Sequence, residues 1–130
     1  MNKVDGLLFA KTHEWVKLGD DHSFWVGISN HAQEALGDVM FVQLPAINSS
    51  VKQGQACASI ESLKAASDIH APVSGKIIAI NPVAQDTPEM INSEPYEIWL
   101  FKIKSDQADS AKGELNSLLT PSAYDKSLED

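Results

Sequence analysis

The sequence predicts a mainly β fold of short antiparallel strands, with small helices at the middle and at the C-terminus. Two pairs of β-rich segments are each joined by a short turn, as in β-hairpins: Glu14–Leu18 with Ser23–Ile28, and residues 56–60 with residues 67–70. Helical spacing of apolar residues becomes prominent only after residue 105. These observations favour packed sheets over a helical bundle.

The first predicted hairpin turns at residues 19–22, which are rich in turn formers. After it, Ser29 or Asn30 can cap a short helix that ends at Leu36. Gly37 then stands where a helix often needs a left-handed residue. The sequence therefore predicts about two helical turns after the first hairpin.

A β-rich run at residues 39–44 predicts a strand, which Pro45 ends. A polar loop follows at residues 48–54. The second hairpin then turns at residues 62–65, and residues 76–80 form another short apolar strand. Residue 64 is therefore expected at or beside the tip of a hairpin.

The last quarter of the chain changes from strand to helix. Residues 87–89 predict a helix start with proline at the first helical position, residues 92–96 a loop, and residues 97–104 the last strand. Helical spacing then covers residues 108–119, and a final short helix begins at Thr120-Pro121.

With 130 residues, the chain is long enough to bury one apolar core without metals or disulfides. We expect one domain over residues 1–130, with a core at about residues 7–104 and a helical segment at about residues 106–128. Composition is ordinary for a globular protein, with 43% hydrophobic and 22% charged residues.

The formal net charge is −8, and all ten basic residues are lysines. Nucleic-acid binding depends on clustered cationic charge and on the planar guanidinium of arginine, so this sequence disfavours it. We expect protein partners with basic surfaces, steered by long-range attraction. A monomer is the simplest expectation for the chain itself.

Cys57 is the only cysteine, which excludes an internal disulfide and fits a reducing compartment. No apolar run approaches the roughly 20 residues that cross a bilayer, and the first nine residues lack the apolar core of a signal peptide. We expect a soluble chain without membrane attachment, in a bacterial cytoplasm or as a mature mitochondrial matrix protein.

Lys64 is the candidate functional residue. Most exposed lysines are only solvated charges, and nine others are present. However, Lys64 follows apolar Leu63 at the expected hairpin tip, with Glu61 on one side and Asp68 on the other. An enzyme that modifies a lysine needs one that protrudes on a rigid turn beside an acidic surface.

The segment ESLKAASD at residues 61–68 closely resembles the lipoylation hairpin of glycine cleavage H-proteins, although that family more often has valine at position 63. Further segments resemble the family in the same order along the chain: THEWV (12–16), VGIS (26–29), AQ (32–33), LGDV (36–39), FVQLP (41–45), APVSG (71–75) and WLFKIK (99–104). The resemblance extends from about residue 9 to residue 124.

The resemblance implies a barrel-sandwich hybrid fold and a carrier without an active site of its own. Lipoate would be amide-linked to Lys64. The carrier would take the aminomethyl intermediate from the glycine decarboxylase to the aminomethyltransferase, and the dithiol to dihydrolipoyl dehydrogenase. A lipoate ligase or a lipoyl/octanoyl transferase would install the cofactor. An arm fixed at one end raises the effective concentration of its cargo at each partner.

The family also rests its loaded arm in a cleft near the His-Glu-Trp segment. Carried over by position, Glu14 would lie near the amine of the arm, with Thr12 and Asp68 as neighbours. A carboxylate beside an ammonium is electrostatically favourable. The alternative for Glu14 is a surface carboxylate that flanks a buried tryptophan.

Other polar residues predict no chemistry. The four histidines show no ligand spacing, so no metal site is expected. His31 could face the arm but is expected to face solvent on its helix, and Cys57 is expected to be a small core residue. No catalytic triad, phosphate loop or HExxH pattern occurs, so we expect no enzyme.

Three alternatives stay open at this stage: a lipoate relay to 2-oxoacid dehydrogenases, a biotin carrier, and an interaction module without cofactor. A relay would keep the fold. The only hint of divergence from the carrier role is the segment Tyr96–Trp99, which is one residue shorter than usual in the family and lacks its glycine. Biotinylated lysines are typically flanked by methionines, whereas Lys64 is flanked by Leu63 and Ala65.

Overall fold

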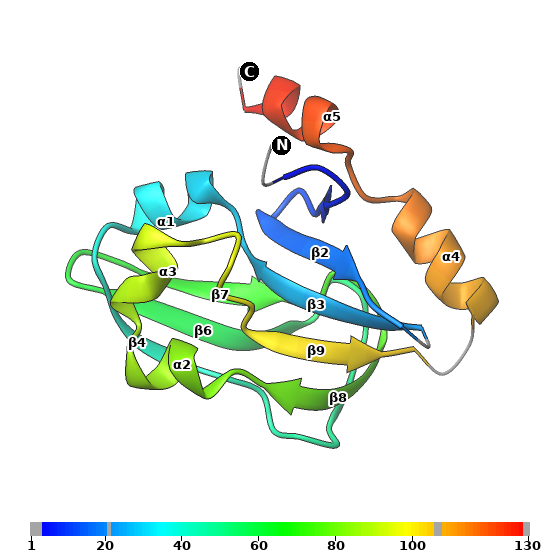
Figure 1. The fold of residues 1–130 in the computed structure, drawn as a ribbon, viewed down its shortest axis with the longest axis horizontal. Coiled ribbons are helices and arrows are strands. Elements are labelled where there is room, and N and C mark those ends of the chain that lie inside the picture. Colours follow the sequence, from blue (N-terminus) through cyan, green and yellow to red (C-terminus); the bar gives the residue numbers. More distant parts are fainter. Residues whose placement is uncertain (1–3, 21, 106–107, 129–130) are drawn as a thin grey trace.

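The computed structural model describes residues 4–20, 22–105 and 108–128 (Figure 1). In chain order its elements are β1 (Leu8–Phe9), β2 (Glu14–Leu18), β3 (Ser23–Ile28), α1 (Asn30–Leu36), β4 (Val39–Gln43), β5 (Ser50–Val51), β6 (Ala56–Ser62), β7 (Ala66–His70), β8 (Gly75–Ile80), α2 (Pro82–Asp86), α3 (Glu89–Ser93), β9 (Phe101–Lys104), α4 (Ala108–Asn116) and α5 (Pro121–Ser127).

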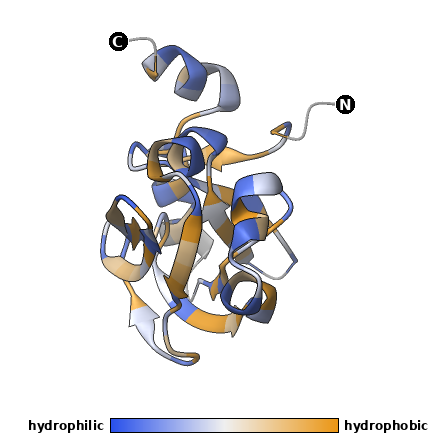
Figure 2. Ribbon diagram, turned by 90° about the vertical axis from the view of Figure 1, so that its left-hand side faces the viewer, coloured by the Kyte–Doolittle hydropathy of each residue, from blue (hydrophilic) through white to orange (hydrophobic). Residues whose placement is uncertain are grey.

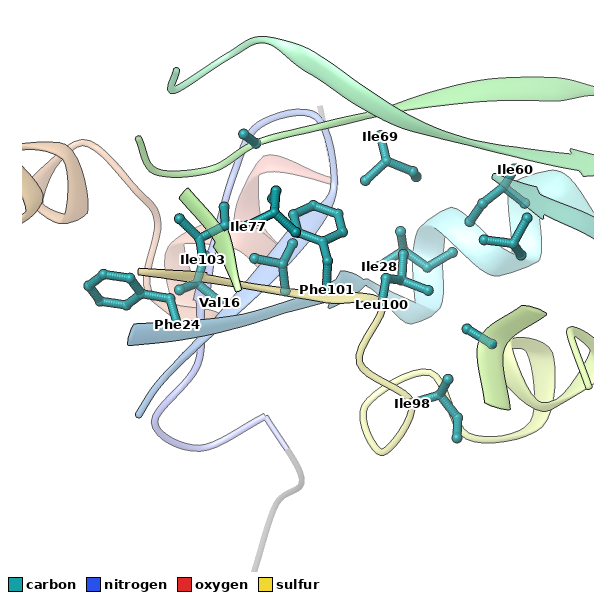
Figure 3. Packing of buried hydrophobic residues seen from close by; sticks show 14 of the residues in the cluster. Val16, Phe24, Ile28, Ile60, Ile69, Ile77, Ile98, Leu100, Phe101 and Ile103 are labelled. Carbon is teal, nitrogen blue, oxygen red and sulfur yellow. The ribbon is translucent and has the colours of Figure 1, made fainter. Parts of the chain in front are cut away.

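The strands form two antiparallel sheets that pack against each other. One has the order β1-β2-β3-β9-β8-β5 and the other the order β4-β6-β7. Ile60 and Ile69 extend from the smaller sheet toward Leu100 and Phe101 on the larger one, and all four side chains are buried (Figure 3). This confirms the predicted mainly β sandwich. Apolar burial between the sheets is the main stabilising contribution.

A second cluster covers the outer face of the larger sheet. Phe9 and Tyr124 stack with ring centroids 4.3 Å apart, and Leu7 and Trp15 complete the buried part of the cluster. The backbone of Leu119 pairs with that of Phe9 in an isolated bridge, which brings α5 against β1. Figure 2 shows that most residues of α5 are hydrophilic, while orange, apolar residues concentrate on the strands.

The structure confirms the first hairpin, the second hairpin and the helix between them. Ser29 is the N-cap of α1, since its hydroxyl accepts a hydrogen bond from the N–H of Ala32 at 3.1 Å. Gly37 ends the helix with φ +77°, a conformation that costs little only for glycine. The strand before Pro45 and the helix after Thr120 also agree with prediction.

Three short elements were missed by sequence reasoning: β1, β5 and α2. Two residues are too few to show a period, so β1 and β5 carry no pattern, and β5 lies within the segment expected to be a polar loop. The start of α2 did have a signal, because Asn81 caps it through Val83 and Pro82 takes the first helical position.

The prediction was also wrong at several boundaries in the last third. The strand expected at residues 97–104 covers only Phe101–Lys104, because the N–H groups of Glu97 and Ile98 both donate to the carbonyl of Glu94 and close a turn after α3. Pro88 caps α3 instead of starting it, and the expected loop at 92–96 begins inside this helix. The helix expected to reach residue 119 ends at Asn116.

None of the helices in the described part of the chain is both long and apolar enough to span a membrane.

Candidate functional site

Lys64 lies at the tip of the hairpin between β6 and β7. Ser62 organises the turn: its N–H donates to the carbonyl of Ala65 at 2.8 Å, and its hydroxyl oxygen accepts the N–H of Ala65 at 3.1 Å. Below the tip, Glu61 pairs with Ala66 in regular antiparallel register. The structure thus confirms the predicted turn at residues 62–65 and shows that its own hydrogen bonds fix it.

The side chains at the tip face solvent. Leu63 is 78% exposed, and Lys64 is also exposed. The end of the Lys64 side chain lies near Gly37, where an added Cβ would be 3.0 Å from Cε of the lysine. The lysine thus extends over the C-terminus of α1, where helical carbonyls favour a cation.

A cleft of about 280 Å³ opens beside this hairpin. Its walls come from the turn before β2, the end of β3, α1 and the hairpin. The lining residues are Thr12, His13, Ile28, His31, Ala32, Ala35, Leu36, Ala65, Ala66, Ser67, Asp68 and Ile69. Most of them are small or apolar, so the cleft suits an aliphatic group with a polar end.

Thr12 and Asp68 line this cleft, whereas Glu14 lies behind it. Glu14 is only 1% exposed, which contradicts the alternative of a surface carboxylate. Its Oε1 accepts a hydrogen bond from the hydroxyl of Thr12, and its Oε2 accepts one from the backbone N–H of His70 at 2.8 Å. The structure therefore connects Glu14 to the cleft through Thr12.

Burial raises the pKa of the Glu14 carboxyl, and the hydrogen bonds from His70 and Thr12 partly oppose that rise. The imidazole Nδ1 of His70 lies 3.4 Å from Oε2 of Glu14. This nitrogen is buried and has no hydrogen-bond partner among the described residues. Glu14 thus connects β2 of the larger sheet to β7 of the smaller one.

Sequence reasoning missed a second polar group at the cleft. His13, for which no role was predicted, lines it together with His31, and the two ring centroids are 4.8 Å apart. His31 is exposed, as expected, and its place at the cleft fits the alternative that it faces the arm. Tyr124 lies 111 residues from His13 in sequence, yet its hydroxyl is 2.7 Å from Nδ1 of that histidine. Only the positive φ of His13, +81°, marks the site locally, and no sequence pattern predicts it.

Cys57 is half-buried on β6, as expected for a small core residue. Burial, together with the nearby charge of Glu14, raises the pKa of its thiol to about 12. Reactive cysteines have a lowered pKa, so the raised pKa argues against a reactive thiol here. Within residues 4–20, 22–105 and 108–128, no three His, Cys, Asp or Glu side chains come together as a metal site would require.

A sandwich of two small sheets that presents an exposed lysine on a rigid hairpin, beside a narrow cleft, defines a carrier domain of the barrel-sandwich class. The family model of the glycine cleavage H-protein matches residues 7–130. The chain therefore belongs to the glycine cleavage H-protein family, and its function is that of a lipoyl carrier in glycine cleavage.

Individual relatives agree with this assignment. The chain is 64% identical over 103 residues to the glycine cleavage system H protein of Polynucleobacter necessarius, covering 79% of this chain and 69% of that protein. It is 52% identical over 125 residues to the glycine cleavage system H protein of Shigella dysenteriae, covering 95% of this chain and 94% of that protein. The crystal structure of the glycine cleavage system H protein from Mycobacterium marinum matches with a TM-score of 0.85 at 34% identity. The match covers 96% of this chain and 98% of that one.

Proposed function

We propose that Lys64 carries the lipoyl group as an amide and presents it to the enzymes of glycine cleavage, and that the chain performs no catalysis itself. The observation that carries this proposal is the position of Lys64 at the exposed tip of a hairpin whose turn Ser62 fixes. A protruding lysine on a rigid turn is accessible to a modifying enzyme and to each later partner.

The neighbouring residues fit a lipoyl group. The group is a long apolar chain with a dithiolane at its end, and Ile28, Ala32, Ala35 and Leu36 offer an apolar wall next to the hairpin. When bound, it supplies a disulfide that accepts a one-carbon fragment together with electrons. Thr12 and Asp68 would provide the polar contacts of a resting arm, with Glu14 holding Thr12 in place.

The surface around Lys64 suits docking of partners with basic groups. Glu61 and Asp68 are exposed on the hairpin, and Leu63 and Phe41 add apolar area with 78% and 70% exposure. Phe41 pairs with Glu61 across β4 and β6, so an apolar and an acidic residue stand opposite each other there. Amide formation removes the charge of Lys64, which changes the formal net charge from −8 to −9 (−8 − 1 = −9).

Membership in the family implies partners from the glycine cleavage system. We propose the glycine decarboxylase, the aminomethyltransferase and dihydrolipoyl dehydrogenase, together with a lipoate ligase or a lipoyl/octanoyl transferase that modifies Lys64. The relatives named above are bacterial, which supports a bacterial cytoplasmic protein over a mitochondrial matrix form. We propose that the chain acts as a monomer.

Intact-mass measurement after incubation with a lipoate ligase, lipoate and ATP tests the attachment site. Wild-type protein should gain the mass of one lipoyl group, and Lys64→Arg should gain none. Lys76→Arg, an exposed lysine on β8, is the control and should be modified like the wild type. Lipoyl groups on Lys64→Arg, or an unmodified wild type, would contradict the proposal.

Reconstitution of glycine decarboxylation with the three partner enzymes tests the role. The lipoylated wild type should support glycine decarboxylation, whereas a lipoate relay would be lipoylated and still not support it. The matches to glycine cleavage H proteins favour the first outcome over the relay and over a biotin carrier.

A further inference from the structure

A chain of three hydrogen bonds links the C-terminal helix to the cleft beside Lys64. The hydroxyl of Tyr124 on α5 lies 2.7 Å from Nδ1 of His13 and 2.7 Å from the hydroxyl oxygen of Ser29. That oxygen also accepts the N–H of Ala32 at 3.1 Å and thereby caps α1. Tyr124 and Ser29 are both buried, so their mutual hydrogen bond is buried, whereas the bonds to His13 and Ala32 are part-buried.

Counting protons along this chain gives one arrangement in which every group is satisfied. The hydroxyl oxygen of Ser29 accepts the N–H of Ala32, and Tyr124 is its other hydrogen-bond partner among the described residues. The arrangement that uses the Ser29 proton therefore donates it to Tyr124. The proton of Tyr124 then goes to Nδ1 of His13, which must be unprotonated. In the reverse direction, the buried hydroxyl proton of Ser29 would have no acceptor within the described part of the chain, which costs stability.

The backbone of His13 is also fixed. Its φ of +81° is unusual for a residue with a side chain, and two bonds hold it: its N–H donates to Ala10 at 3.0 Å, and its carbonyl accepts the N–H of Ser29 at 2.9 Å. Because Nδ1 is engaged with Tyr124, Nε2 is the nitrogen left for a group in the cleft, which His13 lines.

We propose that Tyr124 is a positioning residue that holds His13 as a neutral imidazole, with its proton on Nε2, at the wall of the cleft beside Lys64. The ring can then donate a hydrogen bond to an arm in the cleft without repelling an ammonium on that arm. This second part rests on the proposed function of the cleft as the resting place of the arm.

The main influences on the His13 ring favour its neutral form. Burial, followed by the neighbouring His31 of α1, lowers the pKa of His13. The other titratable groups around the ring are Tyr124 of α5, Asp68 of β7 and Glu14, which lies behind Thr12. When His13 becomes protonated at low pH, the ring repels a cationic arm.

The first experiment uses protein without lipoate, so that it does not depend on the proposed function. Long-range ¹H–¹⁵N NMR reports the tautomer and the titration of each histidine. Wild-type His13 should show the Nε2–H form. Tyr124→Phe keeps the ring that stacks on Phe9 and removes only the hydroxyl, so the His13 midpoint should shift to higher pH and the tautomer preference should weaken.

Tyr96→Phe is the matched control. Tyr96 packs edge-on against the same Phe9, but its hydroxyl accepts the N–H of Asn30 instead of contacting His13. This variant should leave the tautomer and midpoint of His13 unchanged. An Nδ1–H tautomer in the wild type, or equal effects of the two tyrosine variants, would overturn the proposal.

The second experiment uses lipoylated protein whose reduced arm is alkylated with 2-bromoethylamine, which places a primary ammonium on the arm. Amide shifts of Ala32 and Ser67 report whether the arm occupies the cleft. We expect the arm to leave as His13 is protonated, and to leave at higher pH in Tyr124→Phe. His13→Asn tolerates a positive φ and cannot be protonated, so this pH-dependent release should be lost.

The outcomes separate the two proposals. If Lys64 takes no lipoyl group, the proposed function fails, while the NMR result on the unmodified protein still decides the state of His13. If the arm is attached but leaves at the same pH in the wild type, Tyr124→Phe and His13→Asn, the role of Tyr124 is wrong and the carrier function stands.

Discussion

The side chain of Lys64 extends past the α-carbon of Gly37: a Cβ on Gly37 would lie 3.0 Å from Cε and 3.5 Å from Nζ of the lysine. The residue that ends α1 and the residue at the hairpin tip are therefore in contact across 27 positions of sequence (64 − 37 = 27). The absence of a side chain at position 37 leaves room for the lysine.

Gly37→Ala should affect both stability and modification. The backbone at φ +77° and ψ −157° is essentially restricted to glycine, so we expect a loss of about 1–3 kcal/mol in the free energy of unfolding. The added methyl group should also displace Lys64 and change its rate of lipoylation. Urea denaturation and a ligase assay measure the two effects.

Gly54→Ala is the control for that variant. Gly54 also has a positive φ, +88°, but a Cβ there would contact nothing within 4 Å. It should lose stability through backbone strain alone, by about 1–2 kcal/mol, with unchanged lipoylation. Equal changes in lipoylation rate for both variants would show that the contact with Lys64 is unimportant.

Glu14→Gln should change how stability depends on pH. Because burial raises the pKa of Glu14 above its ordinary value of 4.5, the unfolded chain releases this proton first as pH rises. The contribution of Glu14 to stability therefore falls from pH 4.5 up to its pKa in the folded protein. Relative to Glu14→Gln, the wild type should lose stability over that range, as measured by urea denaturation; a relative gain would contradict the raised pKa.

Cys57 should resist alkylation in the folded protein. Its pKa of about 12 lies three pH units above the ordinary 9.0, so at a given pH near 8 the thiolate fraction is lowered roughly 1000-fold. Iodoacetamide should therefore react far more slowly with native protein than with protein in denaturant. Comparable rates in the two states would show that the thiol is not shielded.

Gly27→Ala should strongly destabilise the larger sheet. A Cβ at this position would lie 2.4 Å from two ring carbons of Trp15, and that indole cannot easily shift because its Nε1–H donates to the carbonyl of Pro95 at 2.9 Å. Overpacking of this kind costs about 1–3 kcal/mol or more. Thermal unfolding followed by tryptophan fluorescence measures the loss.

Gly113→Ala is the opposite case on α4. A Cβ there meets nothing within 4 Å, so the substitution should stabilise the helix by up to about 1 kcal/mol. A destabilisation by Gly113→Ala as large as that by Gly27→Ala would contradict the assignment of the effect to Trp15.

Local sequence patterns were sufficient to predict the structure wherever a residue interacts with its own neighbours in sequence. Ser29 caps α1, Gly37 ends it, and the turn at residues 62–65 forms from Ser62 and Ala65, all as predicted. The boundaries failed where tertiary contacts override a pattern. The alternation before Phe101 predicted a longer strand, but a turn after α3 closes at Glu94–Ile98, and the buried Ile98 and Leu100 lie between this turn and β9.

Sequence by itself determined the two hairpins, the mainly β class and Lys64 as the candidate, because alternation and turn chemistry are local properties. Only the tertiary structure decided what surrounds that lysine. Glu14 is buried instead of exposed since β7 closes over it, and His13 meets Tyr124 because α5 folds back onto β1. Such contacts join residues far apart in sequence, and no local period encodes them.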